Sequence, residues 1–115
     1  MNTLEDSVLR AVDAVAEESG NRVTKQLVDL FKSAVLKKYK VAFDEELKQG
    51  SVHRDNVDKA VDFCFAETCV MFRQLTIPGM DDVAKENEIG LMKSMLGDIK
   101  RQVQVILENG GVVIL

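Results

Sequence analysis

The amino-acid sequence predicts an all-α protein, a four-helix antiparallel bundle with a short apolar C-terminal tail. Three observations predict this fold. Nonpolar residues recur at three- and four-residue steps over long segments, which is the period of an amphipathic helix. The chain has one proline and seven glycines, so the breaks between these segments are few and easily located. The connections are short, and short connections make sequential helices antiparallel neighbours.

We expect a single helical domain over residues 1–115, because an additional boundary would leave two undersized cores. Apolar residues make up 46% of the chain and charged residues 30%, which is enough to fill an interior and to solvate an exterior. Aromatic residues are only 5% and Trp is absent, so aliphatic residues and Met must form most of the core.

The first helix is expected between Thr3, a candidate N-cap, and Gly20. The second is expected from Thr24 to Gly50, or about seven turns. The first helix is mainly acidic and the second begins with basic residues, so antiparallel pairing would bring opposite charges together. Their nonpolar stripes are Leu4, Val8, Val12 and Val15, then Leu27, Phe31, Ala34, Val35, Tyr39, Ala42, Phe43 and Leu47.

A third helix is expected after Gly50, with Ser51 or Asp55 as its cap. It should end before Pro78, which cannot continue a helix and biases the preceding residue towards extended angles. From residue 60 to residue 72 this segment is apolar almost all round. We therefore expect it to be the central helix, enclosed by the other helices or by a second subunit.

The fourth helix is expected from Asp81 to Glu108. Two carboxylates at its start would interact favourably with the positive, N-terminal end of the helix dipole. Gly90 and Gly97 each cost up to about 1 kcal/mol relative to alanine, so this helix is expected to be kinked or to start late, near Ile89. After it, residues 112–115 form a β-prone apolar tail behind a glycine hinge.

Cys64 and Cys69 are five residues apart, so on a helix they point away from each other and cannot easily form a disulfide. Two buried free thiols are typical of a reducing compartment. The N-terminal residues do not resemble a secretory signal, and no apolar run approaches the roughly 20 residues that cross a bilayer. We expect a cytoplasmic protein that makes no use of a membrane.

The residues of a catalytic or cofactor site do not occur together in this sequence. A nucleophilic hydrolase needs a Ser or Cys activated by an oriented His, and the one histidine, His53, is expected to be a solvent-facing loop residue. Two Cys and one His fall short of a zinc site, and no phosphate-binding glycine motif is present. We therefore assign no catalytic, cofactor-binding or metal residues, and we expect a protein that is not an enzyme.

Two segments are candidate partner-binding sites. One is the basic run of the second helix; the other is the apolar tail, which would fold back over the core, pair with a dimer mate or add a strand to the sheet edge of a partner. The alternative interpretation of the basic run is an ordinary solvent-exposed helix face that binds no partner. The residues of the two segments are Lys37, Lys38, Tyr39 and Lys40, then Val112, Val113, Ile114 and Leu115.

A short helix, a long helix and then residues 51–61 resemble the helix order and second loop of the histone fold, with residues 22–24 as its first loop. The resemblance covers about half the chain, and DNA binding is what it would imply. The second helix is shorter and the third longer than in that family, and the chain is acidic, so we assign no family.

The sequence favours a non-enzymatic helical protein–protein interaction module, such as a small regulator, adaptor or inhibitor, that forms a homodimer. The homodimer hypothesis rests on the excess of apolar residues in the third and fourth helices. Four helices of this size would leave some of these residues exposed to water. The alternative is a nucleic-acid-binding regulator that uses the basic face of the second helix. The net charge of −4 opposes that alternative, because the acidic chain repels a phosphate backbone. A third possibility is an enzyme or ligand carrier with a cavity inside the bundle.

Overall fold

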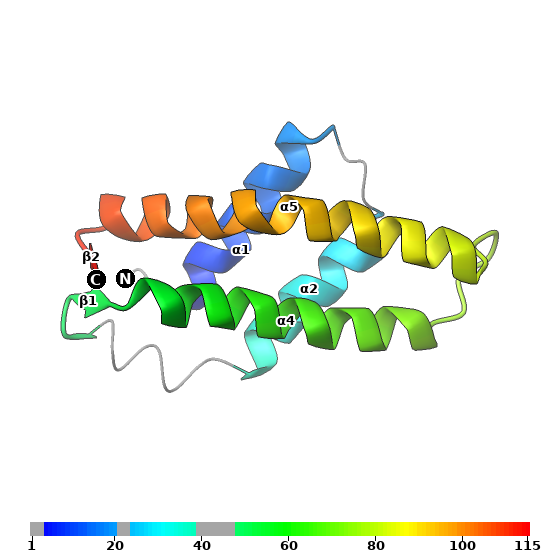
Figure 1. The fold of residues 1–115 in the computed structure, drawn as a ribbon, viewed down its shortest axis with the longest axis horizontal. Helices are drawn as coiled ribbons and strands as arrows, with labels where there is room; N and C mark the ends of the chain where they lie inside the picture. The colour runs from blue at the N-terminus through cyan, green and yellow to red at the C-terminus, as the bar shows by residue number, and fades with distance from the viewer. Residues whose placement is uncertain (1–3, 21–23, 39–47) are drawn as a thin grey trace.

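The computed structural model describes residues 4–20, 24–38 and 48–115 of the protein. Four helices account for most of these residues, and a pair of two-residue strands accounts for a few more, so the predicted all-α fold is confirmed (Figure 1). The elements in chain order are α1 (Leu4–Glu18), α2 (Lys25–Lys38), β1 (Ser51–Val52), α4 (Arg54–Gln74), α5 (Asp82–Asn109) and β2 (Val113–Ile114).

The helices form two antiparallel pairs that pack face to face. Helices α4 and α5 make one long hairpin, and α1 and α2 cross behind it obliquely (Figure 1). Helix α1 packs on α5 and α2, while α4 packs on α2 and α5, so each helix has two neighbours around a common core. This is the predicted four-helix bundle. The 28 residues of α5 span about 42 Å, which explains most of the 47 Å length of the molecule.

Within the described residues, the core contains the nonpolar stripes that the sequence predicts. The second half of the second predicted helix, with Tyr39, Ala42, Phe43 and Leu47, lies outside the described residues, as does the side chain of Leu4. Leu27, Phe31 and Val61 are completely buried, and Phe65 is half-buried against them.

Among the described residues, the expected charge pairing between the first two helices includes an ion pair between Lys32 of α2 and Asp13 of α1. An exposed ion pair contributes only about 0 to 1 kcal/mol to the stability of the fold. This contact therefore helps more to set how α1 and α2 align than to stabilise them.

Helix α4 begins differently from the expectation. It starts at Arg54, its N-cap is His53 in an extended conformation, and no side chain caps it. The prediction of Ser51 or Asp55 as the cap is therefore wrong. Ser51 belongs instead to β1, where it pairs with Val113, and Asp55 already lies in the first helical turn.

Helix α5 runs continuously from Asp82 to Asn109, so the expectation of a late start near Ile89 is wrong, while the alternative of a kink stays a prediction. The Asp81 side chain accepts a hydrogen bond from the Ala84 N–H at 2.8 Å, which caps the helix at its predicted beginning. Gly90 and Gly97 lie on the exposed face. Burial outweighs the cost of two glycines, since the opposite face buries Ile89, Met92, Leu96, Ile99, Val103 and Leu107.

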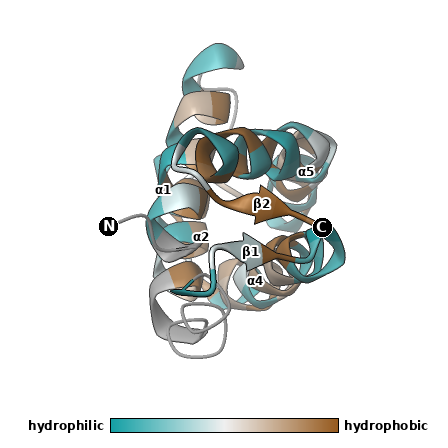
Figure 2. Cartoon of the chain, turned by 90° about the vertical axis from the view of Figure 1, so that its left-hand side faces the viewer, coloured by the Kyte–Doolittle hydropathy of each residue, from teal (hydrophilic) through white to brown (hydrophobic). Residues whose placement is uncertain are grey.

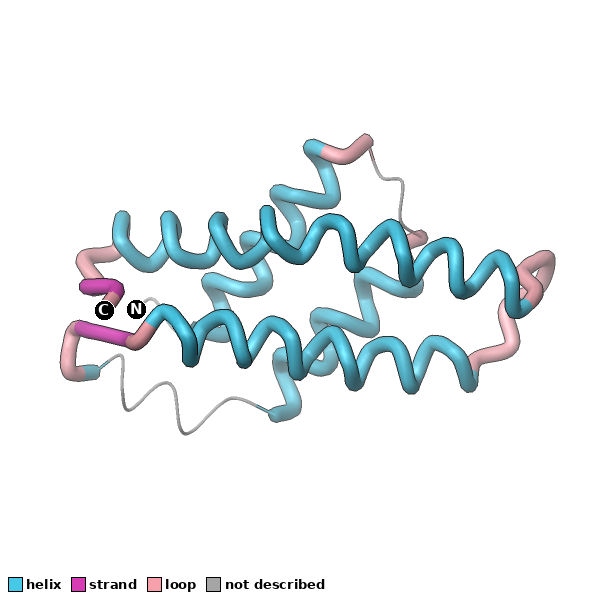
Figure 3. Tube along the Cα trace, viewed as in Figure 1, coloured by secondary structure: helices cyan, strands magenta, loops and turns pink. Residues whose placement is uncertain are grey.

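The C-terminal tail folds back on its own chain. Strand β2 pairs in parallel with β1, and the Val113 N–H donates to the Gly50 carbonyl oxygen at 2.9 Å (Figure 3). The Leu115 carbonyl oxygen accepts from the Arg54 N–H at 3.0 Å, one of the N–H groups that the start of α4 leaves unpaired. The pairing is parallel because α4 and α5 are antiparallel: the end of α5 meets the start of α4, and the turn at Gly111, with φ of 88°, reverses the tail.

Candidate interaction surface on helix α4

Helix α4 has two apolar faces, and the protein buries only one of them. Its inner face, which includes Val57, Val61 and Phe72, is fully buried against the other helices. On its outer face Phe63 is 45% exposed, Val70 is 55% exposed and Ala66 is exposed. Within one chain, therefore, α4 is not the enclosed central helix that the sequence predicts. Four helices in a ring can cover each helix on two sides only, so one side of α4 faces outwards.

Five residues of the outer face surround a shallow hollow with a volume of about 230 Å³, which we call the outer hollow. They are Phe63, Ala66, Glu67, Val70 and Met71. The first four are spaced as i, i+3, i+4 and i+7, the arrangement that forms the hole for a side-chain knob of a facing helix in helix–helix packing. Ala66 is the small residue between the two large ends, so a facing helix could approach closely there.

Polar contacts with α5 anchor the helix that carries the outer hollow. Lys100 of α5 forms an ion pair with Asp62 at 2.7 Å, and the Gln104 side-chain amide donates to Asp58 at 3.3 Å. Buried Thr68 donates from its hydroxyl to the Cys64 carbonyl oxygen at 2.6 Å within α4. A surface on a packed helix loses little conformational freedom when a partner binds. The outer hollow is therefore preorganised.

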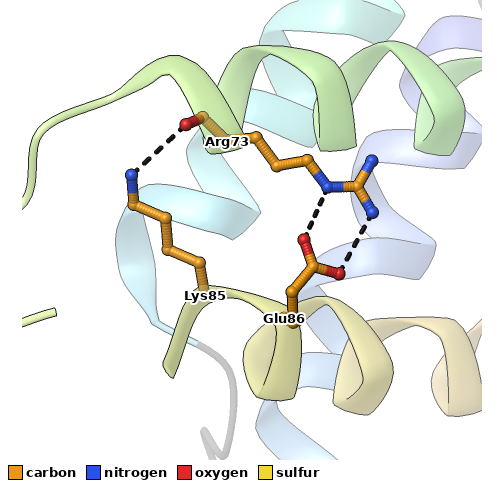
Figure 4. Close-up of polar contacts among 3 residues, drawn as sticks. All are labelled: Arg73, Lys85 and Glu86. Atoms are coloured by element: carbon orange, nitrogen blue, oxygen red, sulfur yellow. Dashed lines mark hydrogen bonds and ion pairs between the residues drawn. The ribbon is translucent and has the colours of Figure 1, made fainter. Parts of the chain in front are cut away.

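A second hollow lies where α4 ends and α5 begins, and polar residues line it. The Arg73 guanidinium holds the Glu86 carboxylate with two hydrogen bonds, of 2.6 Å from Nε and 3.1 Å from Nη2 (Figure 4). This contact raises the pKa of Arg73 and lowers the pKa of Glu86. The buried Lys85 ammonium donates to the carbonyl oxygens of Arg73, at 3.3 Å, and Leu75.

These contacts brace the α4–α5 hairpin. The carbonyl groups at the end of a helix lack intrahelical hydrogen-bond donors and form the negative end of the helix dipole. At the end of α4 the Lys85 ammonium supplies both a hydrogen-bond donor and a compensating positive charge. In this polar hollow Arg73 and Glu86 are bound to each other and Lys85 is bound to the backbone, which is a structural role that does not require a ligand.

Neither cysteine is placed for nucleophilic chemistry. Both thiols are free and buried, as the sequence predicts. Burial, and secondarily the negative charge of Glu67, raises the pKa of Cys64 to about 12. Burial is also the main cause that raises the pKa of Cys69. Because the thiolate is the reactive form, both side chains stay protonated and inert at neutral pH.

The two segments that the sequence singled out for partner binding have different positions. Val112 and Ile114 pack against the core, whereas Val113 and Leu115 are 57% and 59% exposed beside β1. The hydrogen bonds to β1 already occupy one edge of the tail. Lys37 and Lys38 end helix α2, but their side chains, like Tyr39 and Lys40 as a whole, lie outside the part of the chain that the structure describes. The nucleic-acid alternative thus stays a prediction from sequence.

The outer hollow was not among the sites predicted from the sequence, although the sequence carries a signal for it. Phe63, Ala66 and Val70 are a second apolar stripe on a segment that is apolar almost all round. A second stripe at helical spacing is the pattern of a helix that packs on two sides. The sequence left open whether the other helices or a second subunit cover this stripe, and the neighbouring helices of the chain cover only the first stripe.

Comparison with known proteins finds no family model, no curated protein and no solved structure that matches this chain. Among the described helices, none has both the length and the apolar character that crossing a bilayer requires. Over residues 4–20, 24–38 and 48–115, Cys, His, Asp and Glu side chains do not gather in groups of three that could hold a metal ion. The geometry of the described residues is therefore what supports a function.

Proposed function

We propose that the protein is a non-enzymatic helical interaction module, a small regulator, adaptor or inhibitor, and that it forms a homodimer through the outer hollow of α4. The observation that carries the proposal is the spacing of Phe63, Ala66, Glu67 and Val70 around a hollow on an anchored helix. Such a hole fits a side chain of a second helix. A second copy supplies that helix, because the same face of α4 carries both the hole and large side chains beside it.

The size of this face predicts a weak dimer. The apolar part of the face extends over residues 63–71, somewhat more than two turns, or about 13 Å. A stable interface buries about 800 Å² on each partner, and a helix contact of this length buries less. We expect an equilibrium between monomer and dimer that depends on concentration in the micromolar range or above, as suits a module that exchanges partners.

The proposed setting is the cytoplasm. Buried Cys64 and Cys69, both free, support a reducing compartment. The chain would act there through binding alone: partners that carry an amphipathic helix would compete with the second copy for the same hollow.

Light scattering coupled to size exclusion, over a concentration series, tests the proposal. We expect the mean mass to rise from monomer towards dimer with concentration. Val70→Glu should hold the protein at the monomer mass, because it adds a second carboxylate beside Glu67 in each copy, and like charges in the contact oppose association. Val105→Glu is the matched control, since Val105 is 42% exposed on α5 and lies outside the outer hollow.

A wild-type protein that remains monomeric at the highest concentration would remove the homodimer from the proposal. A dimer that Val105→Glu disrupts and Val70→Glu leaves intact would instead move the contact to α5.

A further inference from the structure

We infer that residues 113–115 are a strap that opens independently of the four helices, and that its opening uncaps the start of α4 while the end of α5 stays closed. The strap is β2 together with Leu115, and it lies beside β1 at the open end of the α4–α5 hairpin (Figure 3). It lies outside the outer hollow, so the proposed dimer contact does not depend on it.

The end of α5 is closed by its own turn, without help from the strap. The Gly111 N–H donates to the Glu108 carbonyl oxygen at 3.0 Å. The Val112 N–H donates to the Leu107 carbonyl oxygen, also at 3.0 Å. With Gly111 in the left-handed conformation, these two bonds form the Schellman motif that commonly ends a helix. Both bonds lie within residues 107–112, so the strap can leave without breaking either of them.

The start of α4, in contrast, depends on the strap. The side chain of its N-cap residue, His53, makes no capping hydrogen bond. The first N–H groups of a helix have no acceptor within the helix, and the strap supplies one: the Arg54 N–H donates to the Leu115 carbonyl oxygen at 3.0 Å. When the strap leaves, Arg54 loses this acceptor. Opening therefore exposes the first turn of α4 to water, whereas the last turn of α5 is unchanged.

The strap itself is held by little buried apolar surface. The register pairs Ile114 with the fully buried Val52, so the two side chains point to the same face of the strand pair. Ile114 is half-buried against the core, whereas Val113 and Leu115 are both more than half exposed. Segments that bury few apolar atoms open locally at a lower free energy than the core. The strap thus opens more often than the helices unfold.

While it is closed, the strap occupies one edge of β1. The Gly50 and Val52 carbonyl oxygens accept hydrogen bonds from it, both at 2.9 Å, and the Arg54 N–H donates one to it. An extended segment of a partner that aligned parallel to β1 would need the same backbone groups. The strap therefore competes internally with any such segment, and its opening makes this edge of β1 accessible.

Hydrogen exchange, followed residue by residue by NMR, tests the strap in the full chain. In the wild type we expect the amides of Arg54, Val113 and Leu115 to share one protection factor, about tenfold below that of amides in the middle of α4 and α5. Ile114→Ser removes the half-buried side chain and should lower these three protection factors together, by about fivefold, because fewer apolar atoms hold the strap. The Val112 amide, which bonds within the end of α5, should keep its protection.

Leu115→Ser is the matched control, because it shortens an exposed side chain of the same strap and should change these protection factors by less than about twofold. Equal protection of the strap and of the middle of the helices in the wild type would show that the strap opens only with global unfolding, and would overturn the inference even if a variant failed to fold. Loss of protection at Val112 together with the strap would overturn it as well. So would unchanged protection at Arg54 when Val113 and Leu115 lose theirs.

Discussion

The inner and outer faces of α4 are both apolar, but their surroundings differ. The inner face buries Phe72 completely, whereas Phe63, on the outer face of the same helix, keeps 45% of its surface exposed. The two residues have the same side chain and lie nine positions apart. The free energy of transfer from water favours burial of both side chains, because both are hydrophobic. The positions of the neighbouring helices determine which of the two the chain itself covers (Figure 2).

The largest expected effect separates these two phenylalanines. Phe72→Ala should lower the free energy of unfolding by about 3 to 5 kcal/mol, because it leaves a cavity in the core. Phe63→Ala should cost at most about 1.5 kcal/mol, because half of its side chain is already hydrated. Urea unfolding followed by circular dichroism at low protein concentration measures both. Equal losses would show that the outer face is covered within the monomer.

A second comparison concerns two lysines on α5. Lys85→Met should cost about 1 to 3 kcal/mol, since it removes the ammonium that satisfies the Arg73 and Leu75 carbonyl oxygens. Lys93→Met, on the exposed face, should change stability by less than about 0.5 kcal/mol. The same urea titration compares them. If the two substitutions cost the same, the brace at the end of the hairpin does not contribute to stability.

Substitution of the glycines of α5 tests whether the outward face of that helix is exposed to solvent. Gly97→Ala should stabilise the protein by about 0.5 to 1 kcal/mol, because alanine restricts the unfolded chain and a Cβ at this position meets no atom within 4 Å. Gly90→Ala should behave alike. A rise in the midpoint of thermal unfolding is the readout. Destabilisation by either alanine would mean that another surface approaches α5 there.

The smallest expected effect comes from the exposed Arg73–Glu86 pair. Because Arg73 lowers the pKa of Glu86 in the folded protein from its ordinary value of 4.5, the folded state binds this proton less readily than the unfolded state. The contribution of Glu86 is thus present above pH 4.5 and is lost as the pH falls through the lower, folded pKa. Glu86→Gln should flatten the decline of stability in that acid range, and Glu108→Gln, at the far end of α5, is the matched control. Unfolding curves from pH 3 to 7 would register the difference.

The candidate site was only half predictable. The sequence shows that residues 60–72 are apolar on two sides, and it offers a second subunit as one way to cover them. The sequence does not show which of the two apolar stripes the other helices cover. The pairing of the tail was less predictable still, because β1 and β2 are about 60 residues apart and each contributes only two residues to the pair.

By itself the sequence determined the approximate positions of the described helices, while the predicted part of the second helix over residues 39–47 lies outside the described residues. The break before Pro78, the helix start at Asp81 and the stripe that includes Leu27 and Phe31 depend on interactions within a few residues of the chain, and they match the structure. Tertiary structure alone decided the contacts between distant residues, such as Thr24 N–H with the Glu88 carboxylate at 3.1 Å, and decided which face of α4 stays exposed. The reason is physical: helical hydrogen bonds close over four residues, whereas cover from water depends on where every other helix packs.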